Sequence, residues 1–329
     1  MALLASGRGK VQWPCAQAGE GELLQSCRLT TRRSDSMAIT LLAIVLVLAT
    51  AHALPDLARL RDFSWLRIWL SRWQGDGAQS GRPVLLLPAL VFALCALIQA
   101  GLDHVLFGLP LFAFAVIVLF FCWGPRELDA DIDAVLKAPD RDQRLVAAQA
   151  LRPDPADQPL LFEAAPLVEA AFASALSRWF GVLFWFVVLG PAGALGYRMI
   201  QLIARSRSFS DALDARQLDI AERTARILDW APAHLIALTL ALVSDFDAVI
   251  KTWRDYHAAH GQGYFTLDLG FLGALAHAGV DADVVAGDGY AVDVNDPVNE
   301  LADARRVLRR ILVAWLAILA LMVLAGFAR

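Results

Sequence analysis

The sequence predicts an all-α fold: a polytopic membrane protein with four or five spanning helices, plus amphipathic and soluble helices. Hydrophobic residues make up 58% of the chain, against about 45–50% in an average soluble domain. Charged residues make up 19%, against about 25% on average. Several apolar runs also approach the length of about 20 residues that a helix needs to cross a bilayer.

The apolar runs define the expected spans in chain order. The second and third runs are separated by only a short polar segment, so they are expected to form a tight antiparallel hairpin. The fourth run contains a glycine- and proline-rich stretch, and the last follows an arginine-rich segment. The five expected spans are residues 38–54, 84–100, 105–123, 180–204 and 311–327.

Residues 232–250 form a shorter apolar run that starts at a proline. The run is too short for an ordinary crossing, so it is expected to be re-entrant, interfacial or buried against other helices. The charged segment before it, residues 210–229, has the pattern of a separate amphipathic helix. One face of that helix carries Leu213, Gln217, Ile220, Thr224 and Ile227, and its charged residues are expected on a solvated face.

Residues 1–36 have no sustained periodicity and are predicted to be a disordered extension, or to lie upstream of a true start at Met37. An alternative reading is a signal peptide. Arg32-Arg33 precede an apolar core, and Ala51-His52-Ala53 has the form of a cleavage site. Residues 37–329 are then expected to form a single membrane domain.

Several kinds of chemistry are disfavoured. The net charge of −4 gives no basic surface for a nucleic-acid partner. Asp129, Asp131 and Asp133 alternate as in a calcium loop, but Ala134 occupies the position that requires glycine. Acidic residues at a helix start and on its solvated face explain them better. Without a zinc motif, phosphate loop or dinucleotide fingerprint, we expect no metal and no cofactor, and the lipid bilayer is the expected partner.

Five residues are candidates for function, none of them assigned a catalytic role. Ionisable groups at membrane depth are functional candidates by default, since burying them in lipid is costly. The competing interpretation is that Asp229 caps a helix end and Trp230 anchors the membrane interface. The candidates are Glu169, Arg198, Asp229, Trp230 and His234.

Three stretches carry a resemblance to a known family: Leu183-Phe184-Trp185, Gly190 to Arg198, and Asp229-Trp230-Ala231-Pro232-Ala233. They resemble the AmpE family of inner-membrane proteins, the β-lactamase regulatory modulators, from about Met37 to the C-terminus. The resemblance implies a multi-pass inner-membrane protein that regulates or senses. It links the chain to β-lactamase induction, to the response to β-lactam antibiotics and to partners in cell-wall recycling.

A more distant resemblance is to the cobinamide-phosphate synthases of cobalamin biosynthesis. It implies the alternative function, a membrane enzyme acting on an amphiphilic substrate. Those enzymes carry an Asn-Thr-x-Asp-Gly stretch, and the matching positions here are Ser174, Ala175, Ser177 and Arg178. The missing amide and carboxylate favour a non-enzymatic protein. Convergence of Glu169, Asp229 and His234 on one pocket would favour the enzyme. Transport, a third reading, is disfavoured because no internal repeat is visible.

Overall fold

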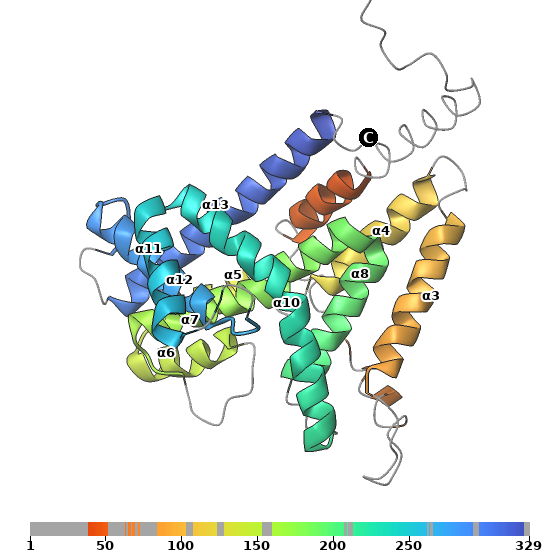
Figure 1. Cartoon of the computed structure of the whole chain (residues 1–329), viewed down its shortest axis with the longest axis horizontal. Helices are drawn as coiled ribbons and strands as arrows, with labels where there is room; N and C mark the ends of the chain where they lie inside the picture. The colour runs from red at the N-terminus through yellow and green to blue at the C-terminus, as the bar shows by residue number, and fades with distance from the viewer. Residues whose placement is uncertain are drawn as a thin grey trace, which may run out of the picture.

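The computed structural model describes residues 39–51, 63, 65–66, 68–69, 72, 84–102, 108–123, 128–152, 160–206, 209, 213–261, 263, 266–291 and 296–325. Every regular element in these ranges is helical, which confirms the predicted all-α class. The bundle is elongated, with α3, α4 and α8 toward one end and α6, α11 and α12 toward the other (Figure 1). The predicted N-terminal extension, residues 1–36, lies outside the described ranges.

Two short helical turns lie between the α-helices of the described ranges. A 3₁₀ turn over Gln149–Leu151 follows α6, and a π-helical turn over Leu176–Phe180 joins α7 to α8. The helices are Ile39–Ala51, α3 (Leu86–Leu102), α4 (Leu109–Cys122), α5 (Leu128–Lys137), α6 (Arg141–Ala148), α7 (Ala164–Ala175), α8 (Gly181–Arg205), α10 (Ala215–Val243), α11 (Phe246–His260), α12 (Gly270–Val285) and α13 (Pro297–Leu324).

Three helical units in the described ranges are long and apolar enough to cross a membrane. They are Ala164–Arg205, Ala215–Val243 and Pro297–Leu324. Three shorter apolar helices accompany them: Ile39–Ala51, α3 and α4. Large apolar side chains on α3 and on the second half of α13 are exposed, as expected of surfaces that face lipid. These features identify a membrane protein.

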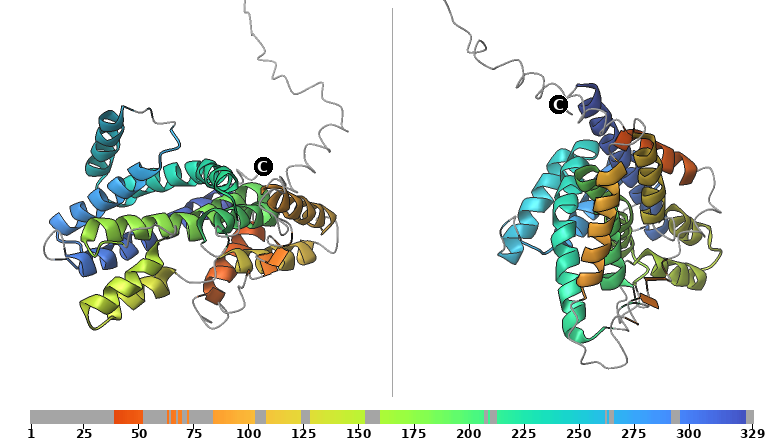
Figure 2. Two further views of the ribbon diagram at one scale, coloured as in Figure 1. Left: turned by 90° about the horizontal axis from the view of Figure 1, so that it is seen from below. Right: turned by 90° about the vertical axis from the view of Figure 1, so that its right-hand side faces the viewer.

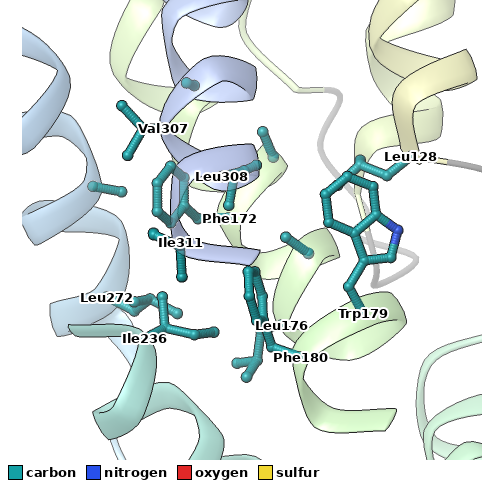
Figure 3. Close-up of a cluster of buried hydrophobic side chains, with 14 of the residues drawn as sticks. Leu128, Phe172, Leu176, Trp179, Phe180, Ile236, Leu272, Val307, Leu308 and Ile311 are labelled. Carbon is teal, nitrogen blue, oxygen red and sulfur yellow. The ribbon is translucent and has the colours of Figure 1, made fainter. Parts of the chain in front are cut away.

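The largest apolar core lies where α5, α7, α10, α12 and α13 meet (Figure 3). Phe172 of α7 and Phe180 of the π-helical turn are fully buried there. The ring of Phe180 packs edge-on against Trp315 of α13, at 5.1 Å between centroids. Because these side chains come from helices far apart in sequence, the core fixes the C-terminal helix α13 against the centre of the chain.

The helix α8 is bent sharply at Gly190, whose φ of 71° is a left-handed conformation that favours glycine. Pro191 follows and cannot continue the preceding hydrogen bonds. The side-chain amide of Gln99 from α3 covers the bend. A Cβ on Gly193 would lie 2.4 Å from the carbonyl oxygen of Trp185, so only glycine permits this approach. The glycines of the predicted fourth span therefore build a bend as well as close packing.

The helix α10 is one continuous helix of 29 residues, where the sequence analysis expected a charged helix and a separate short run. Asp214 begins it with a reciprocal capping box, accepting from the backbone of Gln217. The face that carries Ile220 and Ile227 is not the buried one, since both side chains are exposed. The buried face consists instead of small residues such as Ala221 and Ala225, which let α8 approach closely.

Pro232 lies inside α10 and lacks the N–H that would bond to the carbonyl of Leu228. The indole N–H of Trp185 in α8 donates to that carbonyl instead, at 3.1 Å. An unsatisfied carbonyl in an apolar environment costs free energy, so the indole takes over the role of the missing backbone donor. This contact explains how α10 continues through a residue that the sequence analysis took as a boundary.

The alternating aspartates of α5 pair with arginines. Asp129 and Asp133 lie four residues apart, as do their two partners on α13, so α5 and α13 run antiparallel. Asp131, on the other side of α5, is buried, and its Oδ2 lies 2.5 Å from the guanidinium of its partner. The expected solvated face is thus a surface of ion pairs. The pairs are Asp129 with Arg309, Asp131 with Arg178, and Asp133 with Arg305.

Replacing Trp185 tests the bond between the indole and the proline-interrupted helix. Trp185→Phe removes the donor to Leu228, and we expect the free energy of unfolding to fall by about 1–3 kcal/mol. Pro232→Ala restores a backbone N–H at the gap, so Trp185→Phe should cost less in that background. The measurement is a double-mutant cycle of unfolding in detergent. Equal costs in both backgrounds would contradict the assignment.

Candidate functional site

Asp229 of α10 is fully buried, and three side chains of α8 donate hydrogen bonds to it. The hydroxyl of Tyr197 lies 2.6 Å from Oδ1, and Nε2 of Gln201 lies 2.8 Å from the same oxygen. The guanidinium of Arg205 lies 2.5 Å from Oδ2. The donors are spaced four residues apart, so they form one stripe along α8. That spacing is the sequence signal that could have revealed the network.

The bend in α8 places Tyr197. In a straight helix, Gly181 and Tyr197 would be roughly 24 Å apart at 1.5 Å per residue. Here a Cβ on Gly181 would lie 2.1 Å from the Tyr197 hydroxyl. The second half of α8 therefore folds back on the first, and the missing side chain of Gly181 leaves room for the hydroxyl that reaches Asp229.

The Asp229 network has the properties of a structural charge pair. A carboxylate buried in an apolar environment needs an opposite charge and further hydrogen bonds, and Arg205, Tyr197 and Gln201 supply them. The structure places Asp229 within α10, not at a helix end, so the capping interpretation is wrong. The pair fixes α10 against α8 in one register.

Trp230 and His234 face a different side of α10. Their ring centroids are 4.3 Å apart, and Nδ1 of His234 lies 2.7 Å from the carbonyl oxygen of Trp230. His234 also packs against Phe271 of α12, at 4.9 Å, and is near Trp253 of α11. Both residues are half-buried in this aromatic cluster. Trp230 is therefore a packing residue at the junction of three helices.

The aromatic cluster includes a second histidine. Trp253 donates its indole N–H to Nε2 of His257, at 2.9 Å, so this nitrogen carries a lone pair and the ring is neutral. Burial lowers the pKa of His257, which favours the same neutral form. Nδ1 of His260 lies 2.8 Å from the carbonyl oxygen of Tyr256. His257 and His260 thus have different hydrogen-bond partners.

Glu169 of α7 lies over Gly273 of α12, where a Cβ would be 2.7 Å from its Cγ. One turn further along α12, His277 lies between two carboxylates. Its Nδ1 is 3.2 Å from Asp281, and its Nε2 is 3.8 Å from Glu300. Burial raises the pKa of Asp281, and the nearby imidazole opposes that rise.

One donor atom each from His277, Asp281 and Glu300 lies within 4.8 Å of the others, a spacing that could hold a metal ion. The sequence analysis expected no metal site. The four-residue spacing of His277 and Asp281 was its only visible signal, and Glu300 comes from the separate helix α13.

Arg198 lies on α8 beside the donor stripe but apart from the network. It is 5% exposed, and its neighbours include Cys122 of α4 and Arg178 of the π-helical turn. The five candidates therefore occupy three places: the α8–α10 contact (Asp229), the α7–α11–α12 side (Glu169, Trp230, His234) and the α4–α8 side (Arg198). Within the described residues, Asp229 faces α8, whereas Glu169 and His234 both lie on the α12 side, so the three side chains are not brought together at one contact.

An apolar cavity of about 280 Å³ lies between α3 and α8. Tyr197 forms part of its wall, together with Gly193 and Gly196, whose small size opens the space. Neither this cavity nor the surface groove between α5 and α6 is lined by Glu169, Asp229 or His234. The cavity could hold an apolar chain beside the Tyr197 side chain.

Comparison with known proteins supports the more distant of the two resemblances. The chain is similar to a protein named "Cobalamin biosynthesis protein CobD" from Stutzerimonas stutzeri (strain A1501), with 25% identity over 145 residues. The match covers 42% of this chain and 47% of that protein, about half its length. No protein-family model matches the chain, and no solved structure matches it.

Breaking the Asp229 pair should destabilise the protein. Asp229→Asn keeps the side-chain size but removes the negative charge that Arg205 faces. We expect the free energy of unfolding to fall by about 3–5 kcal/mol, because a buried charge loses its counter-charge. The control is Asp219→Asn, whose exposed pair with Arg223 should be worth less than about 1 kcal/mol. Similar losses in both variants, by chemical denaturation in detergent, would show that the pair is not structural.

Stability should also depend on pH through His257. A pKa lowered by folding means that the folded protein binds this proton less tightly than the unfolded chain. The contribution is therefore complete above the ordinary value of 6.5 and is lost as the pH falls below it. In His257→Gln the amide oxygen can still accept from Trp253 but does not titrate. Unfolding at about pH 7.5 and about pH 5.5 should show a smaller pH effect in this variant, and an unchanged effect would exclude His257 as the source.

Proposed function

We propose that this chain is a multi-pass inner-membrane regulatory protein without a catalytic centre, with residues 37–329 forming a single AmpE-like domain. Its role would be in β-lactamase induction and cell-wall recycling, as the AmpE resemblance implies, with a partner from that pathway. The observation that carries the proposal is the saturation of Asp229. Three donors already satisfy this buried carboxylate, so it holds helices together and is not available for proton transfer.

The stretch that matches the synthase motif supports the same proposal. Ser174 donates to the carbonyl of Leu151 at 2.6 Å, and Ser177 donates to the carbonyl of Ser174 at 3.1 Å. Arg178 donates to Asp131 and to the carbonyl of Ala150. Each of these side chains therefore has a structural partner. Ser174 and Ser177 stand where the enzymes carry the amide and the carboxylate, and Arg178 stands where they carry glycine.

A membrane enzyme acting on an amphiphilic substrate is the second candidate. Two observations favour it: the similarity to the CobD protein, and the apolar cavity between α3 and α8 that is lined in part by Tyr197. In this reading the cavity would hold the apolar part of the substrate. The chemistry would have to come from residues other than the Glu169, Asp229 and His234 set.

Deletion of the gene tests the regulatory role. We expect β-lactamase induction by a β-lactam to change in the deletion strain, and a plasmid-borne copy to restore it. The measurement is β-lactamase activity with and without inducer. Arg223→Gln, which alters only an exposed ion pair, should complement like the wild type and serves as the control. Unchanged induction in the deletion strain would overturn the regulatory proposal.

A complementation assay separates the second candidate from the first. The chain is expressed in a bacterium that lacks its own CobD protein and requires cobalamin for growth. The regulatory proposal expects no growth without added cobalamin. Growth, at an expression level verified in the membrane fraction, would favour the enzyme.

A further inference from the structure

Arg198 is a buried cation without the partners that buried cations have elsewhere in this protein. It is 5% exposed, and its Nε is buried without a hydrogen-bond partner. Within the described ranges no carboxylate forms an ion pair with it, whereas Arg178 and Arg205 each pair with an aspartate. An isolated charge in an apolar environment is costly, so its retention in the middle of α8 requires a reason.

A second arginine lies beside it. Arg178 of the π-helical turn is close enough to act on Arg198 through its like charge. Arg178 is neutralised by Asp131, at 2.5 Å, and that pair is itself largely buried. The three side chains therefore leave one positive charge unbalanced. The C-terminus of α4 at Cys122 lies on the same side, but a helix terminus carries only about half a unit of negative charge.

An aromatic stack joins two of the elements around Arg198. Trp123, which follows α4, and Trp179, which follows Arg178, stack with centroids 6.4 Å apart and an angle of 12° between their planes. Both indoles are 5% exposed. The stack holds the end of α4 against the π-helical turn, so the elements that flank Arg198 are fixed before any ligand binds. Such preorganisation lowers the entropic cost of binding.

We propose that Arg198, supported by Arg178, binds the phosphate group of a phosphodiester at the junction of α4, α8 and the π-helical turn. A guanidinium presents a planar fork of donors that matches phosphate oxygens. A phosphodiester carries one negative charge, which equals the unbalanced charge of the site. Basic pockets between membrane helices are also a known way to bind anionic headgroups. The inference does not depend on the regulatory role, because binding is measured on the purified protein.

The phosphodiester could belong to a membrane lipid or to a soluble ester, and one titration distinguishes the two. The full chain is purified in a neutral detergent and stripped of lipid. Its unfolding midpoint is then measured with dihexanoyl-phosphatidylglycerol, with glycerophosphoglycerol, and with dihexanoylglycerol, which lacks phosphate. Sodium chloride at matched ionic strength is the reference.

We expect the phosphate-bearing lipid to raise the midpoint in a concentration-dependent way, and dihexanoylglycerol to have no effect. A rise with the lipid alone assigns the site to a lipid headgroup, and a rise with glycerophosphoglycerol as well assigns it to the phosphodiester itself. If neither phosphate compound exceeds the sodium chloride reference, the proposal is wrong. This titration uses the wild-type protein and remains decisive if the variants fail to fold.

Two variants then locate the site. Arg198→Gln should raise the apparent Kd at least about tenfold, the loss expected for one charge-assisted hydrogen bond. Without ligand it should unfold at the wild-type midpoint or above, since it removes an uncompensated charge. Arg223→Gln, an exposed arginine on α10, should bind like the wild type. An Arg198→Gln protein that is less stable but binds normally would show that Arg198 is structural and overturn the proposal.

Discussion

A buried aspartate determines how the middle of this protein is built. Asp229 can lie in an apolar interior only if donors surround it, and the three donors come from one stripe of α8. The stripe reaches Asp229 because α10 presents small residues such as Ala225 to α8. The hydroxyl of Tyr197 fits because Gly181 has no side chain. One charge therefore constrains the spacing of donors on one helix and the side-chain size on both.

Ion pairs also hold other helices of the bundle together. The short helix α5 carries three aspartates, and each pairs with an arginine from α13 or from the π-helical turn. These pairs bring the C-terminal helix to the centre of the bundle, beside the apolar core around Phe172 and Ile311. In Figure 2, α13 is the dark blue helix, which lies against the central, green part of the bundle. The contact between α5 and α13 is therefore held both by ion pairs and by apolar packing.

The sequence alone was sufficient to predict the fold class, because composition and long apolar runs are direct consequences of a lipid environment. It failed at α10 for two physical reasons. Pro232 ordinarily ends a helix, and nothing local shows that Trp185, distant in sequence, replaces the lost donor. The periodicity placed Ile220 and Ile227 on one face but did not show that this face is exposed, because a membrane helix can turn large apolar residues outward and bury small ones. Asp229 was singled out as a functional candidate, but the place of Tyr197 beside it depends on the bend at Gly190, which periodicity does not reveal.

The position of the Asp229 pair also bears on how the protein is made. Arg205 precedes Asp229 in the chain, so α8 lacks this counter-charge until α10 has packed against it. Arg205 lies at the last position of α8, where a long side chain can reach the interfacial water before α10 is in place. Arrival of α10 then withdraws the arginine from that water. The charge pair can therefore form only when α8 and α10 are both in place, which makes it a late contact in the assembly of these two helices.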